Sequence, residues 1–174
     1  MENPVINTLL TRRSIRQYRP NPVEPELLDL ILKAGTYAPT GRGSQSPTIV
    51  AVTNDADRQA LQALNCAARG GSGDPYYGAP TILLVFADPS RHTGVEDAVC
   101  VLNTMMVASH ALGAASCWIH GEYEMFQLPQ GQALLRKWGL PEDLRGVGAL
   151  ALGYAGCPLP QEPQPRREGY VVKV

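Results

Sequence analysis

Charged residues are scarce in this sequence, forming 18% of its 174 positions with a formal net charge of −1. Proteins that bind nucleic acid carry an excess of Lys and Arg, so this balance argues against a nucleic-acid partner and favours a small-molecule ligand. Apolar residues reach 44%, enough for a folded core, and the length is that of one domain. Because little charge remains for the surface, we expect part of it to be covered by a second subunit.

Cysteine pairs and targeting signals are also missing. The four cysteines, Cys66, Cys100, Cys117 and Cys157, are far apart and form no C-x-x-C pair. Their spacing predicts neither a disulfide framework nor a zinc ribbon, and reduced thiols are typical of the cytoplasm. The N-terminus lacks the basic and apolar regions of a signal peptide, so we expect a cytoplasmic protein. The sequence contains no G-x-S-x-G hydrolase motif and no P-loop.

Residues 98–119 contain no Asp, Glu, Lys or Arg. The stretch is long enough to span a bilayer. However, Asn103, Ser109, His110 and a break around Gly113 interrupt it, and its apolar content is modest. We therefore expect a helix buried inside the protein or in a dimer, and no association with a membrane.

The positive charge that is present is concentrated in arginines near the two ends of the chain. Residues 12–19 include four arginines and Ser14, and Arg166 and Arg167 follow near the C-terminus. Guanidinium groups donate paired hydrogen bonds to phosphate oxygens, and a serine hydroxyl can add another. If the two ends of the folded chain meet, these residues would form one phosphate pocket. The alternative is a solvent-exposed basic run.

Hydrophobic periodicity and turn residues predict both helices and strands. The uncharged stretch predicts one helix. Pro39 and Gly139 predict the ends of two of the helices given next. Further helices are expected at residues 3–10, 25–38, 55–68 and 125–138, and strands at residues 48–52, 81–87, 115–119, 147–153 and 170–174.

Three connections are rich in glycine or proline. Residues 39–47 form a polar loop that either presents backbone amides to a ligand or is an ordinary turn, and residues 70–75 form either a mobile lid or a long connection. Prolines at 158, 160, 163 and 165 predict an extended arm that leads to residues 170–174. This last strand has no neighbour in sequence, so we expect it to pair with the sheet edge of another subunit.

Several of these segments, in this order, resemble the FMN-dependent nitroreductase family. They are R-R-S-I-R-Q-Y at 12–18, A-P-T-G-R-G-S-Q at 38–45, residues 97–113, S-C-W-I at 116–119, and the tail from 152 to 166. The resemblance implies an α+β fold with a mixed central sheet flanked by helices, in an intertwined homodimer. Residues 1–174 would be a single domain whose C-terminal arm, residues 156–174, reaches the partner subunit.

The resemblance also implies that FMN binds between the two subunits. Arg16 would approach the pyrimidine edge of the flavin near N1 and O2, where positive charge stabilises the reduced ring. The resemblance assigns contacts with the phosphate and ribityl oxygens to Arg12, Arg13, Ser14, Arg166 and Arg167.

The other implied contacts come from three further segments. Pro39, Thr40 and Gly41 would reach the flavin from the partner subunit, and Asn65 would hydrogen-bond its pyrimidine ring. Gly43 stands where relatives often have asparagine, so that contact either is missing or falls to Gln45. The backbone of Ile119, His120 and Gly121 would pass the isoalloxazine near N5.

The expected activity is an oxidoreductase in which NADH or NADPH reduces FMN at N5 and a nitroaromatic, quinone or similar electron-poor acceptor is reduced in turn. The flavin carries the chemistry, so no catalytic side chain and no metal are predicted. Tyr76, Tyr77 and Phe126 either line the acceptor pocket or belong to the core. Two alternatives remain open: a dehalogenating or flavin-processing enzyme of the same superfamily, and an FMN-binding protein without turnover.

Overall fold

The computed structural model describes residues 3–159 and 162–174. A four-stranded sheet forms its centre, with strand order β1-β2-β4-β3, and every neighbouring pair of strands is antiparallel. The strands are β1 (Thr48–Val52), β2 (Thr81–Ala87), β3 (Ala115–Ile119) and β4 (Arg145–Gly153).

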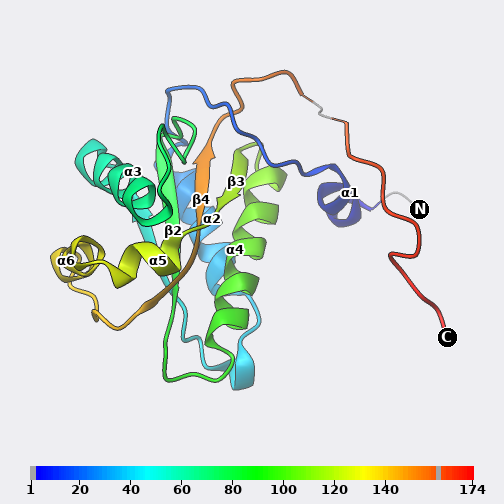
Figure 1. Ribbon diagram of the computed structural model, residues 1–174. Coiled ribbons are helices and arrows are strands. Elements are labelled where there is room, and N and C mark those ends of the chain that lie inside the picture. Colours follow the sequence, from blue (N-terminus) through cyan, green and yellow to red (C-terminus); the bar gives the residue numbers. More distant parts are fainter. Residues whose placement is uncertain (1–2, 160–161) are drawn as a thin grey trace.

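Helices cover both faces of this sheet (Figure 1). One face carries α2 and α4, and the other carries α3, α5 and α6. The helices are α1 (Pro4–Thr11), α2 (Pro25–Thr36), α3 (Asp55–Arg69), α4 (Gly94–Ala111), α5 (Glu122–Gln127) and α6 (Pro129–Lys137), with a 3₁₀ turn, η1, at Gly41–Gly43.

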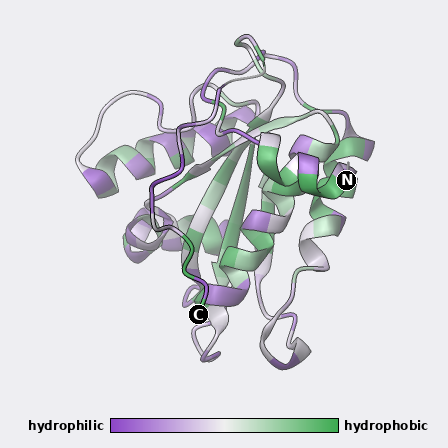
Figure 2. Cartoon of the chain, turned by 90° about the vertical axis from the view of Figure 1, so that its right-hand side faces the viewer, coloured by the Kyte–Doolittle hydropathy of each residue, from purple (hydrophilic) through white to green (hydrophobic). Residues whose placement is uncertain are grey.

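Strand β2 shows why its sequence is continuously apolar. All of its residues are buried, and successive side chains point to opposite faces of the sheet. Leu84 and Phe86 pack against α3, α5 and α6, whereas Leu83 and Val85 pack against α2 and α4. A strand covered on both faces has no polar side, and Figure 2 shows the hydrophobic strands enclosed by helices with polar outer surfaces.

The α+β architecture agrees with the expectation, and three details differ. The four strands of the expected mixed sheet are antiparallel, and the parallel pairing among the described residues is the isolated bridge between Ser14 and Ser116. The expected helix 125–138 is two helices, because Leu128 is extended (φ −79°, ψ 149°) before Pro129. Residues 170–174 form no strand in the single chain, because a strand needs a neighbour to bond with.

Candidate functional site

The arginine-rich segment that follows α1 docks on the sheet edge at β3. Ser14 forms a bridge with Ser116, and the Ile15 amide donates to the Ser116 carbonyl at 3.2 Å. The Ile15 side chain is buried, and the Tyr18 hydroxyl donates to the Ile15 carbonyl at 2.6 Å. In an extended chain, residues on either side of a buried one point the other way, which places Ser14 and Arg16 on the same side.

Arg12, Ser14 and Arg16 all lie near enough to Cys117 of β3 to influence its pKa. Burial raises the pKa of the Cys117 thiol, while the charge of Arg16, a hydrogen bond with Ser14 and the charge of Arg12 act in the opposite direction. The thiol itself is buried, as expected for a packing residue. Three of the predicted cofactor-binding residues are therefore neighbours in the folded chain.

The Arg12 guanidinium has a buried donor that is not hydrogen-bonded within the described residues. Its Nη1 atom is buried and has no hydrogen-bond partner among the described residues. A buried donor without an acceptor destabilises the fold, and a phosphate oxygen would satisfy it. The pKa of nearby His110 is lowered, first by burial and then by the charges of Arg12 and Arg13, so the corner is electropositive. These residues fit the phosphate group of FMN.

Asn65 and the backbone of residues 119–121 form a second part of the same region. Asn65 is buried on α3, and its Nδ2 donates to the His120 carbonyl at 3.4 Å. Gly121 has φ 126°, and a Cβ atom there would lie 2.6 Å from Cδ of Arg69. Glycine is therefore required on conformational and steric grounds. The structure brings together Asn65 and the Ile119–Gly121 backbone.

Of the three aromatic candidates for the acceptor pocket, one faces the solvent. Tyr76 and Phe126 are 2% and 1% exposed, so they belong to the core. Tyr77 is 41% exposed, and the Arg16 guanidinium lies 6.0 Å from the centre of its ring. The sequence offered no signal to separate Tyr77 from the adjacent Tyr76.

The glycine-rich loop is held by a residue that sequence reasoning did not assign. Asp97 in the first turn of α4 is 4% exposed, and its Oδ1 accepts from the Gly41 amide at 2.9 Å. Within the loop, the Thr40 hydroxyl accepts from the Gln45 amide at 3.0 Å. The sequence did offer one indication of this role, because Asp97 is the last acidic residue before the uncharged stretch. Together with Pro39, these residues form one compact turn.

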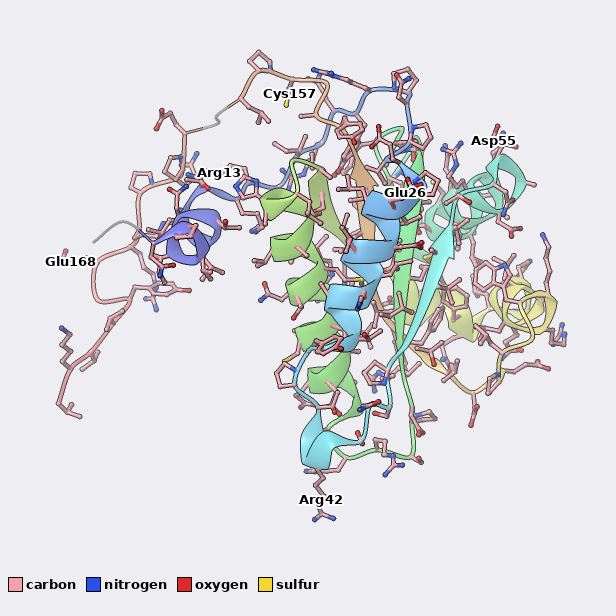
Figure 3. All side chains as sticks on the ribbon, turned by 180° about the vertical axis from the view of Figure 1, so that it is seen from behind. Arg13, Glu26, Arg42, Asp55, Cys157 and Glu168 are labelled. Carbon is pink, nitrogen blue, oxygen red and sulfur yellow. The ribbon has the colours of Figure 1, made fainter. Side chains whose placement is uncertain are left out.

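Two sets of predicted site residues, the Gly41 loop and the arginine-rich segment, lie near opposite ends of α4. Gly41 bonds to Asp97 at the start of α4, whereas Thr11, next to Arg12, bonds to His110 at its end. The 13-residue step between these helix positions corresponds to about 20 Å. Figure 3 shows Arg13 and Arg42 at these two distant ends.

The tail arginines make local contacts among the described residues. Arg166 donates to the Gln164 carbonyl, and the Arg167 guanidinium lies 5.3 Å from the ring centre of Tyr170. The tail leaves the end of β4 and runs away from the sheet (Figure 1). The assignment of Arg166 and Arg167 to a phosphate therefore stays a prediction.

Comparison with known proteins identifies the family. The sequence profile of the nitroreductase family matches residues 9–70 and 57–154. The chain belongs to the nitroreductase family. Both the arginine-rich segment and the Asn65 region lie within the matched residues.

Individual relatives agree with this membership. A protein of Archaeoglobus fulgidus, with the provisional name NADH dehydrogenase/NAD(P)H nitroreductase, is 30% identical over 154 residues, covering 86% of this chain and 84% of the relative. A nitroreductase of Bacteroides fragilis with bound FMN is 29% identical, with a TM-score of 0.88 and coverage of 99% and 100% of the two chains. A Desulfitobacterium hafniense nitroreductase with bound FMN has the same fold, with a TM-score of 0.89, 23% identity and full coverage of both chains.

Proposed function

We propose that this nitroreductase uses FMN to transfer hydride from NADH or NADPH to an electron-poor small molecule such as a nitroaromatic or a quinone. Its relatives bear the names NAD(P)H nitroreductase and FMN reductase. The observation that carries the proposal is the buried, unpartnered Nη1 of Arg12, which stands beside Ser14 and Arg16 on the edge of β3. A free guanidinium donor beside a serine hydroxyl is suited to a phosphate oxygen, and Arg16 is placed to reach the flavin ring.

The residues of the chain bind and orient the cofactor. Arg12 and Ser14 hold the phosphate and ribityl oxygens, and Asn65 with the Ile119–Gly121 backbone positions the ring. When bound, FMN supplies reversible two-electron chemistry at N5. Arg16 opposes the negative charge that reduction places near N1, which makes reduction more favourable.

The proposal includes a homodimer, because one chain cannot complete the site. The loop that contains Pro39–Gly41 lies about 20 Å along α4 from the arginine-rich segment, so a second copy must supply it. Apolar side chains are exposed on α1 and near the C-terminus, including Leu10 at 69% and Val172 at 78%. We infer that the arm formed by residues 156–174 crosses to the partner and covers such surfaces.

The decisive experiment is an absorbance spectrum of the purified protein followed by anaerobic addition of NADH or NADPH. We expect flavin bands that bleach on addition and return when a nitroaromatic or quinone is supplied. A flavin that neither nucleotide reduces would indicate an FMN-binding protein without this turnover. Release of halide from a halogenated substrate would identify the dehalogenating alternative. A protein that stays colourless after FMN is added would overturn the proposal.

A further inference from the structure

Glu122, the first residue of α5, is a carboxylic acid enclosed in the protein. It is 0% exposed, and the Tyr76 hydroxyl lies 3.4 Å from its Oε1 atom. Its Oε2 atom is buried and has no hydrogen-bond partner among the described residues. Burial of an incompletely hydrogen-bonded carboxylate is costly, so the surroundings favour the uncharged acid.

A chain of close contacts joins Glu122 to the residues that hold the flavin. Tyr76 lies 3.8 Å from the sulfur of Met125, and Asn65 Nδ2 lies 3.3 Å from the same sulfur and 3.4 Å from the His120 carbonyl. Glu122 also follows Gly121 directly in the sequence. A charge on Glu122 would therefore lie in the protein interior beside residues assigned to the flavin, where little water screens it.

The backbone that carries Glu122 is closely packed on two sides. A Cβ atom at Gly146 of β4 would lie 2.4 Å from the Glu122 carbonyl oxygen, so the backbones of α5 and β4 touch. On the other side, Gly121 is in close contact with Asn65 and Arg69 of α3, which lies on the same face of the sheet (Figure 1). The backbone at Gly121 and Glu122 is thus packed between β4 and α3.

The charged and titratable groups around Glu122 come from three elements. Burial is the largest influence and raises the pKa of Glu122 to about 8. A hydrogen bond with its own backbone amide, the hydrogen bond from Tyr76 and the charge of Arg69 lower the pKa of Glu122, and the charge of Glu124 of α5 raises it slightly further. From β4 the contact is with the Gly146 backbone, which does not titrate.

We propose that Glu122 is a positioning residue that couples reduction of the flavin to the uptake of a proton. Its carboxyl group is uncharged at neutral pH. When the group is ionised, it takes up one proton from solvent as the flavin is reduced. The inference rests on the proposed function, because it requires a bound flavin next to Asn65 and Gly121. Arg16 and Glu122 then have complementary roles. Arg16 attracts the negative charge of the reduced ring, and Glu122 avoids repelling it.

The electrons and protons balance. Hydride from NADH or NADPH brings two electrons and one proton to the flavin, which gains one negative charge. The negative charge of the reduced flavin raises the pKa of Glu122, because two like charges repel in a buried environment. Above about pH 8, where Glu122 starts ionised, solvent supplies one additional proton to its carboxylate. Below that pH the acid is already protonated, and no additional proton is taken up.

The test compares Glu122→Gln with Glu124→Gln in the FMN-loaded protein. Glutamine keeps the size of the side chain and cannot ionise, and Glu124 is an exposed acid of the same helix, so its variant controls for the change in net charge. The midpoint potential of the flavin is measured from about pH 6 to pH 10, which brackets the ionisation of Glu122. For the wild type and E124Q we expect the slope of potential against pH to double above about pH 8, because two protons instead of one accompany two electrons. E122Q is expected to keep the single-proton slope throughout.

A second measurement needs neither flavin nor turnover. Infrared spectra of the flavin-free protein should show the carbonyl band of a protonated carboxyl group at neutral pH that fades above about pH 8 and is missing from E122Q. Tyr76→Phe removes the hydroxyl that favours the ionised form, so the band should persist to higher pH. This variant keeps the aromatic ring and tests the inference even if E122Q does not fold.

The inference fails if the carboxyl band is absent at neutral pH, or if the wild type and E122Q give the same potential slope. These failures differ from failure of the proposed function. If the wild type binds no FMN, or neither nucleotide reduces it, the proposed function is wrong and the coupling proposed for Glu122 is wrong with it. If the flavin is bound and reducible while the slopes of the two proteins coincide, the inference about Glu122 alone is wrong.

Discussion

At the scale of single residues, the candidate site depends on guanidinium groups presented by an extended segment. Arg16 is exposed, contacts the ring face of Tyr77 and acts on the same buried cysteine as Arg12. It makes one long hydrogen bond, 3.4 Å to the Ser14 carbonyl, so its donors remain available to a ligand. We therefore expect its side chain to contribute more to ligand binding than to folding.

Replacing Arg16 with alanine is expected to weaken FMN binding by about 10- to 100-fold, since a hydrogen bond to a charged group contributes about 1.5–3 kcal/mol. Reduction by NADH or NADPH should slow as well. Flavin fluorescence titration gives the dissociation constant. Arg19→Ala is the matched control, because Arg19 is an exposed arginine bonded to the Ala155 carbonyl. Equal affinities for R16A and R19A would contradict the role assigned to Arg16.

At the scale of secondary-structure elements, two buried aspartates connect the start of a helix to a neighbouring segment through hydrogen bonds. Asp57, near the start of α3, accepts hydrogen bonds from Lys137 at the end of α6 and from the Trp138 indole at 3.1 Å. Asp97, near the start of α4, holds the loop of residues 40–45 through Gly41. Each carboxylate lies in the first turn of a helix, where the helix dipole also favours negative charge.

Asp57→Asn is expected to lower the free energy of unfolding at neutral pH by about 1.5–3 kcal/mol, the usual contribution of charge-assisted hydrogen bonds. The bond with Lys137 lowers the pKa of Asp57 below its ordinary value of 3.8. Its contribution is therefore present above that value and is lost as the pH falls through the lower, folded-state pKa. Urea denaturation at neutral pH and near pH 3 should show the difference between wild type and D57N shrinking in acid.

The control for D57N is Asp55→Asn at the same helix start. Asp55 pairs with Arg58 in solvent, with 79% of its side chain exposed, so its loss should cost no more than about 1 kcal/mol. If D55N destabilised the protein as much as D57N, the loss would reflect the start of α3 in general and not the link to α6.

Asp97→Ala should loosen the loop of residues 40–45. Trypsin cleavage after Arg42, an exposed residue with φ 56°, reports the opening of this loop. We expect cleavage about 10-fold faster than in the wild type, because a bond from a buried carboxylate no longer opposes opening. Glu96→Ala, which removes an exposed acid one position earlier, should cleave at the wild-type rate. Unchanged cleavage in D97A would show that other contacts hold the loop.

At the scale of the whole molecule, the single chain exposes surfaces that a soluble monomer normally buries. Val99 on α4 is 38% exposed, Ile6 on α1 is 53% exposed, and Tyr170 in the tail is 70% exposed. The described residues contain no helix long and apolar enough to cross a membrane. A second copy of the chain is the occupant proposed here for these surfaces, and it would also supply the Pro39–Gly41 loop to each site.

Val99→Asp tests this arrangement by placing a carboxylate on the exposed side of α4. Burying an unpaired charge in an interface costs several kcal/mol, so we expect the dimer to dissociate at least about 100-fold more readily. FMN should be lost in parallel, because each site needs both chains. Sedimentation equilibrium and the flavin content of the purified protein measure the two effects. Ala56→Asp on the exposed side of α3 is the control; a V99D dimer that keeps its FMN would contradict the arrangement.

The sequence by itself determined most of the elements, because hydrophobic periodicity is a local property. The apolar run at 81–87 predicted a strand covered on both faces, which the fold confirms, and Pro25 and Gly70 stand at the start and end of helices as their backbone preferences favour. The family resemblance also proposed Arg12, Ser14 and Arg16 as ligands of the cofactor, and the fold places all three on the segment that docks at β3.

Only the tertiary structure decided which residues from different elements meet and which are cut off from water. The distance between the Gly41 loop and the arginine-rich segment follows from the length and position of α4, which no local pattern reports. Asp97 and Glu122 read as ordinary acids in the sequence and are buried in the fold. Burial and proximity depend on how the sheet and helices pack, and it is burial that gives a carboxyl group an unusual proton affinity.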